Sequence, residues 1–112
     1  KKLYLGLPRD QRLLLIGNLA TSQILHEKLK TTVAKAKSLQ PAMEKLINSA
    51  KSTDKKKAIR TANKVLQNNL SSRKLIEEIS KRYQDKPSGF TRIVKLGFRA
   101  GDAAPMVQIE LV

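Results

Sequence analysis

The chain ends in the stretch that decides most of its fold, GFTRIVKLGFRAGDAAPMVQIELV, residues 89–112. Two runs of alternating apolar residues, one near the start and one at the end of this stretch, flank a loop rich in Gly and Ala. Alternation with a period of two is typical of β-strands, so the segment predicts a β-hairpin. In the second run Val107, Ile109 and Leu111 share one face, which can be buried.

The loop of the predicted hairpin is suited to contact a polyanion. Gly97 and Gly101 allow a backbone φ above zero or a close approach to a partner. Asp102 is expected to cap the turn through its own backbone. Arg99 lies between the two glycines, and its planar guanidinium can bind a phosphate through two hydrogen bonds.

Basic residues of the hairpin form a first candidate phosphate-binding surface. Arg92 and Lys95 lie on opposite faces of the first run, and Arg99 follows in the loop. A structural alternative stays open, because charged side chains commonly protect an edge strand from pairing with another chain.

Helical spacing of apolar residues predicts a first helix from about Arg9 to His26. Gly17 within it costs about 1 kcal/mol relative to alanine, which indicates close packing or a contact at that side. Residues 28–33 then alternate and predict a short strand that pairs with the C-terminal hairpin, although its neighbour in the sheet is left open.

A second helix is predicted after Thr32, its expected N-cap, and Pro41 is expected to kink or locally break it. Its apolar stripe consists of Ala36, Leu39, Met43, Leu46, Ile47 and Ala50. A third helix, with Ile59 facing inward, follows a cap within residues 52–54. A fourth runs over about 73–83 after a serine cap at 71 or 72.

This order of elements predicts an α+β fold, with about four helices packed on a small mixed three-stranded sheet that includes the C-terminal β-hairpin. With 112 residues the chain is expected to form one domain, residues 1–112.

The charge balance indicates a polyanionic partner. The chain has 23 Lys and Arg against 9 Asp and Glu, a formal net charge of +14, and the excess is spread over both halves. A compact domain with this self-repulsion is destabilised unless a partner neutralises it, and nucleic acid is the commonest such partner. A membrane is not expected, because the longest apolar run, 13–16, is far shorter than the roughly 18 residues of a spanning segment.

A second candidate phosphate-binding cluster lies where the predicted first strand meets the second helix, whose free N–H groups also attract anions. Its members are Lys28, Lys30, Thr31, Thr32, Lys35 and Lys37. The alternative for any single lysine is a solvated charged surface. For Lys55, Lys56 and Lys57, on the flank of a short helix, this alternative is favoured.

Catalysis, cofactors, metals and small-molecule substrates are not expected. The chain has no cysteine, hence no disulfide and no thiolate metal site, which fits a reducing compartment. The single histidine, His26, is predicted to lie at a helix end, where capping or surface exposure explains it better than catalysis. Phe90 and Tyr83 are predicted to belong to the core rather than to stack on bases.

The C-terminal stretch resembles the signature of the bacterial-type large-subunit ribosomal protein seventeen family, a strand, a GxRxGDxAPM turn and a final strand ending in IELV. The matching residues are Gly97, Arg99, Gly101, Asp102, Ala104, Pro105 and Met106. A second stretch, NLATSQILHEKLKTTVAKAK, residues 18–37, is similar to the family's helix, strand and helix start. The similarity covers nearly the whole chain.

This resemblance implies a structural constituent of the large ribosomal subunit that binds rRNA and supports subunit assembly. It also implies a location in the cytoplasm on the ribosome, with an organellar ribosome left open. The implied neighbours, near the polypeptide exit side, are ribosomal proteins twenty-two and thirty-two. Family members usually begin with a strongly basic arm, of which residues 1–8 would be a remnant. Here Lys1, Lys2, Arg9 and Arg12 are left to play its part.

Two rival hypotheses remain from the residues alone. The first is a free-standing basic DNA- or RNA-binding regulator, because short basic helices can present a helix-turn-helix. It is weakened by the absence of one privileged recognition helix. The second is a small nuclease, which would need a general base or a metal, with His26 and Glu27 as its only candidates.

Overall fold

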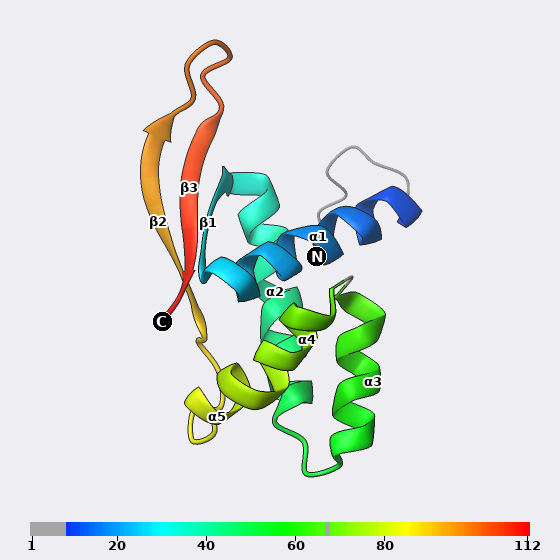
Figure 1. Cartoon of the computed structure of the whole chain (residues 1–112). Coiled ribbons are helices and arrows are strands. Elements are labelled where there is room, and N and C mark those ends of the chain that lie inside the picture. Colours follow the sequence, from blue (N-terminus) through cyan, green and yellow to red (C-terminus); the bar gives the residue numbers. More distant parts are fainter. Residues whose placement is uncertain (1–8, 67) are drawn as a thin grey trace.

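The computed structural model describes residues 9–66 and 68–112, and Figure 1 shows its helices gathered beside a small sheet whose hairpin projects beyond them. The elements are α1 (Arg9–His26), β1 (Lys28–Thr32), α2 (Val33–Ala50), α3 (Lys55–Val65), α4 (Asn69–Lys74), η1 (Leu75–Ile79), α5 (Ser80–Arg82), β2 (Thr91–Phe98) and β3 (Pro105–Leu111). Because α4, the π-helical segment η1 and α5 follow without a gap, they form one helical run. The predicted α+β class, with about four helices and a C-terminal hairpin, is confirmed.

The three strands form an antiparallel sheet in the order β1-β3-β2. The central strand is therefore β3, whose Ile109 lies between Leu29 of β1 and Ile93 of β2. The prediction that the first strand joins the hairpin is confirmed. The sheet differs from the expected mixed one because β1 pairs with β3, to which it runs antiparallel, and not with β2, to which it runs parallel.

Helix α2 packs against the inner face of the sheet and forms the centre of the core. Its predicted apolar stripe is confirmed, because all six side chains are at most 3% exposed. Val107 and Ile109 face α2 from the central strand. Phe90 and Tyr83 are buried with ring centroids 5.2 Å apart, so their assignment to the core is also confirmed.

Polar side chains begin two of the helices. The predicted cap of α3 is confirmed, since a carboxylate oxygen of Asp54 accepts a hydrogen bond from the amide of Lys57 at 3.2 Å. The fourth helical run begins earlier than predicted, because Asn68, rather than Ser71 or Ser72, is its cap. The side chain of Asn68 accepts from the amide of Leu70 at 2.7 Å. Both serines are then buried inside the run.

Two details of the helices differ from expectation. Helix α2 continues through Pro41, so the local break considered for this position does not occur, and the bend expected there stays a prediction. Pro41 and Lys37, one turn before it, are both exposed on α2, and proline has no N–H to donate to the Lys37 carbonyl. Ile59 of α3, predicted to face inward, is 46% exposed. The short α3 contacts its neighbours mainly through the small residues Ala58 and Ala62, which leaves Ile59 at the rim.

The hairpin of β2 and β3 extends beyond β1 and the helices, as the orange and red arrows in Figure 1 show. The molecule consequently measures 46 Å along its longest axis and at most 29 Å across. Gly97 has a φ of 102° at a bulge in β2, and Gly101 has a φ of 101° in the loop. The expectation that these glycines adopt φ above zero is confirmed. None of the described helices combines the length and apolarity needed to cross a bilayer.

The sequence analysis predicted close packing at Gly17, and the structure confirms it. A Cβ at this position would lie 2.8 Å from the backbone carbonyl oxygen of Val65, at the end of α3. Such a contact forces the two helices apart. We therefore expect Gly17→Ala to lower the free energy of unfolding by about 1 to 2 kcal/mol, because overpacking outweighs the better helix propensity of alanine.

Urea unfolding followed by circular dichroism measures this change, and Asn18→Ala is the matched control. Asn18 is the next residue of α1 and is exposed, so alanine there gains helix propensity without a clash. A Gly17→Ala variant as stable as Asn18→Ala would show that the helices separate without cost.

Candidate nucleic-acid interface

The second predicted cluster lies at the corner where β1 passes into α2. Lys28 and Lys30 point outward from β1 and are exposed, on the face of the sheet that α2 does not cover. Thr31, one position along, points to the opposite face and is only 7% exposed. Strand alternation therefore removes the Thr31 side chain from any surface formed by the two lysines, and we leave it out of the interface.

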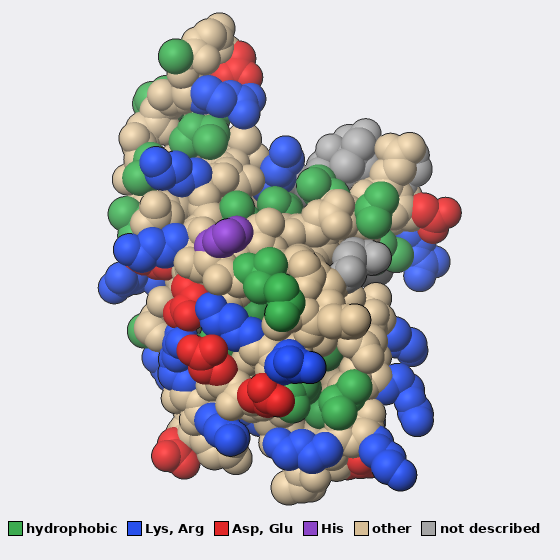
Figure 2. Space-filling model, viewed as in Figure 1, with side chains coloured by type: hydrophobic (Ala, Val, Ile, Leu, Met, Phe, Trp, Pro, Cys, Tyr) green, Lys and Arg blue, Asp and Glu red, His purple; other side chains and the backbone are tan. Residues whose placement is uncertain are grey.

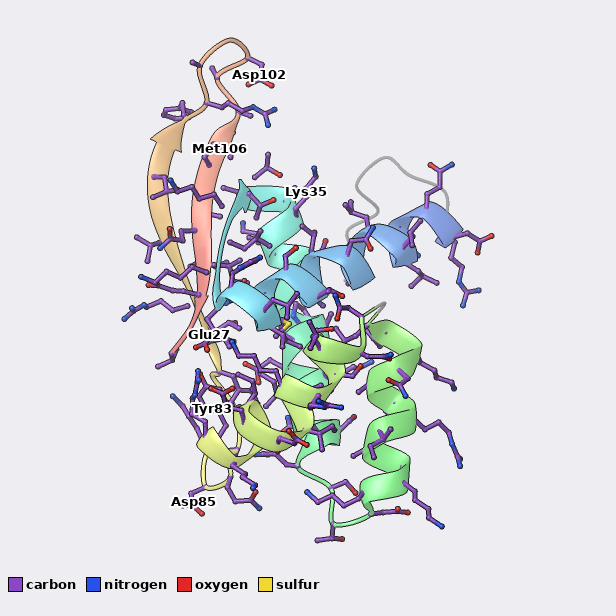
Figure 3. The ribbon with its side chains drawn as sticks, viewed as in Figure 1. Glu27, Lys35, Tyr83, Asp85, Asp102 and Met106 are labelled. Atoms are coloured by element: carbon purple, nitrogen blue, oxygen red, sulfur yellow. The ribbon has the colours of Figure 1, made fainter. Side chains whose placement is uncertain are left out.

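The start of α2 continues this surface. Thr32 occupies the N-cap position with an extended backbone, as predicted, but its side chain makes no capping hydrogen bond. No side chain in residues 9–66 and 68–112 thus accepts a hydrogen bond from the first N–H groups of α2. Lys35 is half-buried and Lys37 is exposed. Figure 3 shows Lys35 at the start of α2, between the hairpin and α1 in this view.

Charge at this corner is not neutralised within the described part of the chain. No Asp or Glu lies within ion-pair distance of Lys30, Lys35 or Lys37 there. An exposed group of cations beside unoccupied helix N–H groups attracts anions. This corner can therefore bind a phosphate without first breaking an internal salt bridge.

Arg92 on the hairpin differs, because it is already paired. Its guanidinium donates from Nε and Nη2 to Oε1 of Glu110, at 3.0 and 2.7 Å. These hydrogen bonds are the main reason why the pKa of Glu110 is lowered. The positive charge of Lys28, which pairs with Glu110 from β1, lowers it further. The Arg92 side chain is still 63% exposed, so one side of it remains open to a ligand.

Arg99 is paired as well, at the tip of the hairpin. Its Nε and Nη2 donate to the two carboxylate oxygens of Asp102, at 3.0 and 2.5 Å. Asp102 also accepts from the amide of Ala104 at 3.2 Å, which confirms its predicted role in the turn. Arg99 first, and then Ala104, lower the pKa of Asp102 to about 2. Figure 3 shows Asp102 at the far end of the hairpin. Lys95, by contrast, has no ion-pair partner among the described residues.

The remaining predicted residues lie apart from both clusters. Arg9 is exposed and Arg12 half-buried at the start of α1, which Figure 1 places away from the hairpin. Lys1 and Lys2, and with them the remnant arm of residues 1–8, lie outside the described residues. The predicted residues are thus spread over separate surfaces and not gathered into one.

Helix α3 adds a further basic surface, although a solvated charged surface was the favoured prediction for its lysines. Its exposed cations are Lys55, Lys56, Lys57, Arg60 and Lys64. Figure 2 shows Lys and Arg side chains distributed over the hairpin, the helical body and its lower edge, with Asp and Glu between them. Such a distribution fits a partner that wraps several sides better than a partner that binds in one cleft.

Glu27, a candidate for the nuclease hypothesis, lies between α1 and β1 and is held there by two cations of the fourth helical run, an arrangement that we call the Glu27 clamp. Its carboxylate accepts from Nη1 and Nη2 of Arg82, at 2.5 and 3.1 Å, and lies 3.0 Å from Nζ of Lys74. Arg82 is the main cause that lowers the pKa of Glu27 from 4.5 to about 2. A carboxylate held so firmly in its ionised form is a poor general base. Within residues 9–66 and 68–112, no three His, Asp or Glu side chains gather as metal ligands would.

Known proteins resemble this chain over nearly its whole length. Residues 15–112 match the model of the ribosomal protein L17 family. The large ribosomal subunit protein bL17 of Neorickettsia sennetsu is 46% identical over 112 residues, which cover 100% of this chain and 96% of the relative. The bL17 protein of Desulforudis audaxviator is 44% identical over 96% of each chain. That of Anaplasma marginale is 43% identical over 94% of this chain and 81% of its own.

The Glu27 clamp predicts a pH dependence of stability. Because the pKa of Glu27 is lower in the folded protein than in the unfolded chain, its contribution is complete above about pH 4.5 and is lost as the pH falls toward 2. After allowance for its partial exposure, we expect Glu27→Gln to lower the free energy of unfolding by about 1 to 2 kcal/mol at pH 7. The loss should shrink at pH 3.

Urea unfolding at pH 7 and pH 3 measures this difference. Glu78→Gln is the matched control, since it removes the same charge from a more exposed partner of Arg82, 3.5 Å away. We expect the control to cost under about 0.5 kcal/mol. Equal losses for Glu27→Gln at both pH values would contradict the assignment of the clamp to the ionised carboxylate.

Proposed function

Because the chain belongs to the ribosomal protein L17 family, we propose that its dispersed Lys and Arg side chains bind phosphates of large-subunit rRNA and so support subunit assembly. The chain is a structural constituent of the large ribosomal subunit, in the cytoplasm, and is not an enzyme. Its partners are rRNA and other ribosomal proteins. We propose that residues 1–112 act in this as one rRNA-binding domain.

One observation carries the proposal for the interface. Within the described residues, Lys30, Lys35 and Lys37 at the corner between β1 and α2 have no ion-pair partner, and no side chain caps the helix N–H groups beside them. Folded RNA offers phosphates at many positions, and contacts to them position a protein without reading the base sequence. The mechanism is therefore positioning by many weak charge contacts around a rigid core.

Further contacts are proposed from the other basic surfaces. Lys28 and Arg92 lie on the outer face of the sheet, on either side of Glu110, so their local net charge is +1. A separate rRNA contact is proposed at the start of α1, formed by Arg9 and Arg12. Lys1 and Lys2, which lie outside the described residues, are also proposed to bind rRNA. Arg99 is proposed to offer RNA the edge of its guanidinium that Asp102 leaves open.

Ribosomal proteins twenty-two and thirty-two are proposed as neighbours, near the polypeptide exit side. This proposal rests on the family resemblance. Crosslinking of intact large subunits with a lysine-reactive reagent, followed by mass spectrometry, tests it. Crosslinks from this chain to other proteins only would overturn it.

No specific observation favours the free-standing regulator. Basic residues lie on α1, β1, α2, α3 and the hairpin alike, whereas a helix-turn-helix protein reads DNA through one recognition helix. The family membership does not favour this alternative either.

Sedimentation tests the function as a whole. We expect the protein in a cell lysate to migrate with the large subunit on a sucrose gradient at moderate salt, and to remain detectable there by mass spectrometry after a salt wash. Absence from that peak, together with a defined footprint on duplex DNA, would contradict the ribosomal function.

A triple variant tests the proposed corner. Replacing Lys30, Lys35 and Lys37 by Ala should weaken rRNA binding and reduce the salt dependence of affinity. Each lost phosphate contact lowers the slope of log K against log salt by about 0.7 to 0.9. Filter binding to a large-subunit rRNA transcript measures this slope. Salt concentrations from about 50 to 200 mM are suitable, because phosphate-dependent affinity falls steeply over that range.

The matched control is Lys55, Lys56 and Lys57 replaced by Ala, which removes the same charge from α3. A triple corner variant with an unaltered slope would show that this corner faces solvent in the complex. Equal effects of both triple variants would attribute binding to net charge and not to the corner.

A further inference from the structure

Phe98, at the end of β2, is the most exposed large apolar side chain in the described part of the molecule, at 76%. The other aromatic rings of the described chain, Tyr83 and Phe90, are both buried. An aromatic ring exposed to this degree gives up the stability that its burial would contribute, about 2 to 3 kcal/mol for phenylalanine. Its position beside basic residues on a projecting hairpin therefore calls for a binding explanation.

The bulge in β2 determines which way Phe98 points. Lys95 pairs with Val107, and Gly97 pairs with Met106, so one residue of β2 is skipped between them. Without this skip, strand alternation would place Phe98 on the outer face, opposite to Lys95. With it, Phe98 pairs with Pro105 and shares the inner face with Lys95 and Val107. Bulges commonly re-aim a side chain in this manner, and the positive φ of Gly97 permits this one.

On the inner face the ring overhangs the start of α2, where helices no longer cover the sheet. A hollow of about 230 Å³ lies there, and its lining includes Val33, Lys95, Gly97, Phe98, Pro105 and Met106. Figure 3 shows Met106 on β3, below the hairpin tip and near the start of α2. The hollow is mostly apolar, with one cation at its rim.

One cation lines the hollow, and a second lines the hollow next to it. Lys95 belongs to its lining, and Lys37 lines an adjoining hollow with Thr32 and Pro105. Neither lysine has an ion-pair partner among the described residues. An exposed aromatic ring with two uncompensated positive charges in the adjoining hollows suits a unit of single-stranded nucleic acid, a base with its flanking phosphates.

We propose that Phe98 stacks on an unpaired base of large-subunit rRNA, held in this hollow with its flanking phosphates at Lys95 and Lys37. This inference rests on the proposed function and adds a site to it. A hydrophobic side chain of a neighbouring protein could also fill the hollow, but it would leave both lysines beside an apolar group without a counter-charge. Charge complementarity therefore favours the base.

Substitutions at Phe98 test the stacking. Phe98→Leu keeps an apolar side chain of similar reach but removes the aromatic face, and Phe98→Tyr keeps that face. We expect the Leu variant to bind a large-subunit rRNA transcript about 5- to 150-fold more weakly, and the Tyr variant to bind within about twofold of the parent chain. Since stacking releases no counter-ions, the salt slope of both should stay unchanged.

A second measurement uses the absence of tryptophan from the chain, which makes Phe98→Trp the sole indole reporter. Stacking on a base quenches indole emission, whereas insertion into a protein pocket shifts it to shorter wavelength and keeps its intensity. We expect emission to fall at least twofold on binding to a large-subunit rRNA transcript, which itself contains no indole. The control reporter is Leu70→Trp, at an exposed position of α4 far from the hairpin in Figure 1.

The outcomes separate this inference from the function on which it rests. Equal rRNA affinity of Phe98→Leu and the parent chain, with a reduced salt slope for the corner lysine variant, would overturn the stacking alone. Unchanged emission of Phe98→Trp on the transcript, or a blue shift without quenching, would also overturn the stacking. Failure of the corner variant as well would overturn the proposed interface.

Discussion

A shortage of carboxylates governs this molecule. The chain has 9 Asp and Glu against 23 Lys and Arg, and most Lys and Arg of the described part form no ion pair, so mutual repulsion opposes the compact state. The core of α2 and the sheet must hold the chain together against this repulsion until a polyanion relieves it. Binding and stability are therefore coupled, because any ligand that prefers the folded protein raises its stability by mass action.

The carboxylates that exist are placed where they support local structure. Five of the nine accept hydrogen bonds from backbone N–H groups or form an ion pair that joins two elements. They are Glu27, Glu44, Asp54, Asp102 and Glu110. Glu44, for example, accepts from the amides of Gly89 and Phe90, at 3.1 and 3.0 Å, where the chain enters β2. Such contacts fix the ends of elements more than they neutralise surfaces. The surfaces of the corner between β1 and α2, and of α3, keep their charge as a result.

Local patterns in the sequence predicted the local parts of this structure. The bounds of α1, the apolar stripe of α2 and the Asp54 cap follow from spacing and propensity, which act within a few residues. Long-range strand pairing could not be predicted in this way. The central position of β3 arises because β1 pairs with β3 and not with β2, and no local pattern decides between the two. The same holds for the pairing of Arg92 with Glu110, 18 residues away, which converts a predicted ligand into a partly neutralised one. Phe98 had a signal in the sequence, an apolar residue between Gly97 and Arg99, but only the bulge shows which face it joins.

In the hairpin, not every basic residue is free to bind a partner, because some of them form ion pairs that stabilise the hairpin itself. A two-stranded ribbon is marginally stable alone, and this one projects beyond the helices that could support it. Its stability must come from β1, which adds a third strand at the base, and from ion pairs within the ribbon itself. Arg92 with Glu110 ties its two strands, and Arg99 with Asp102 closes its tip. Two of its three predicted cations thus act first on the shape of the hairpin, and Lys95 keeps its charge for a partner. In the proposed complex, these ion pairs hold the hairpin in shape before RNA arrives, with one uncompensated cation beside one exposed ring, so that little conformational entropy would be lost on binding.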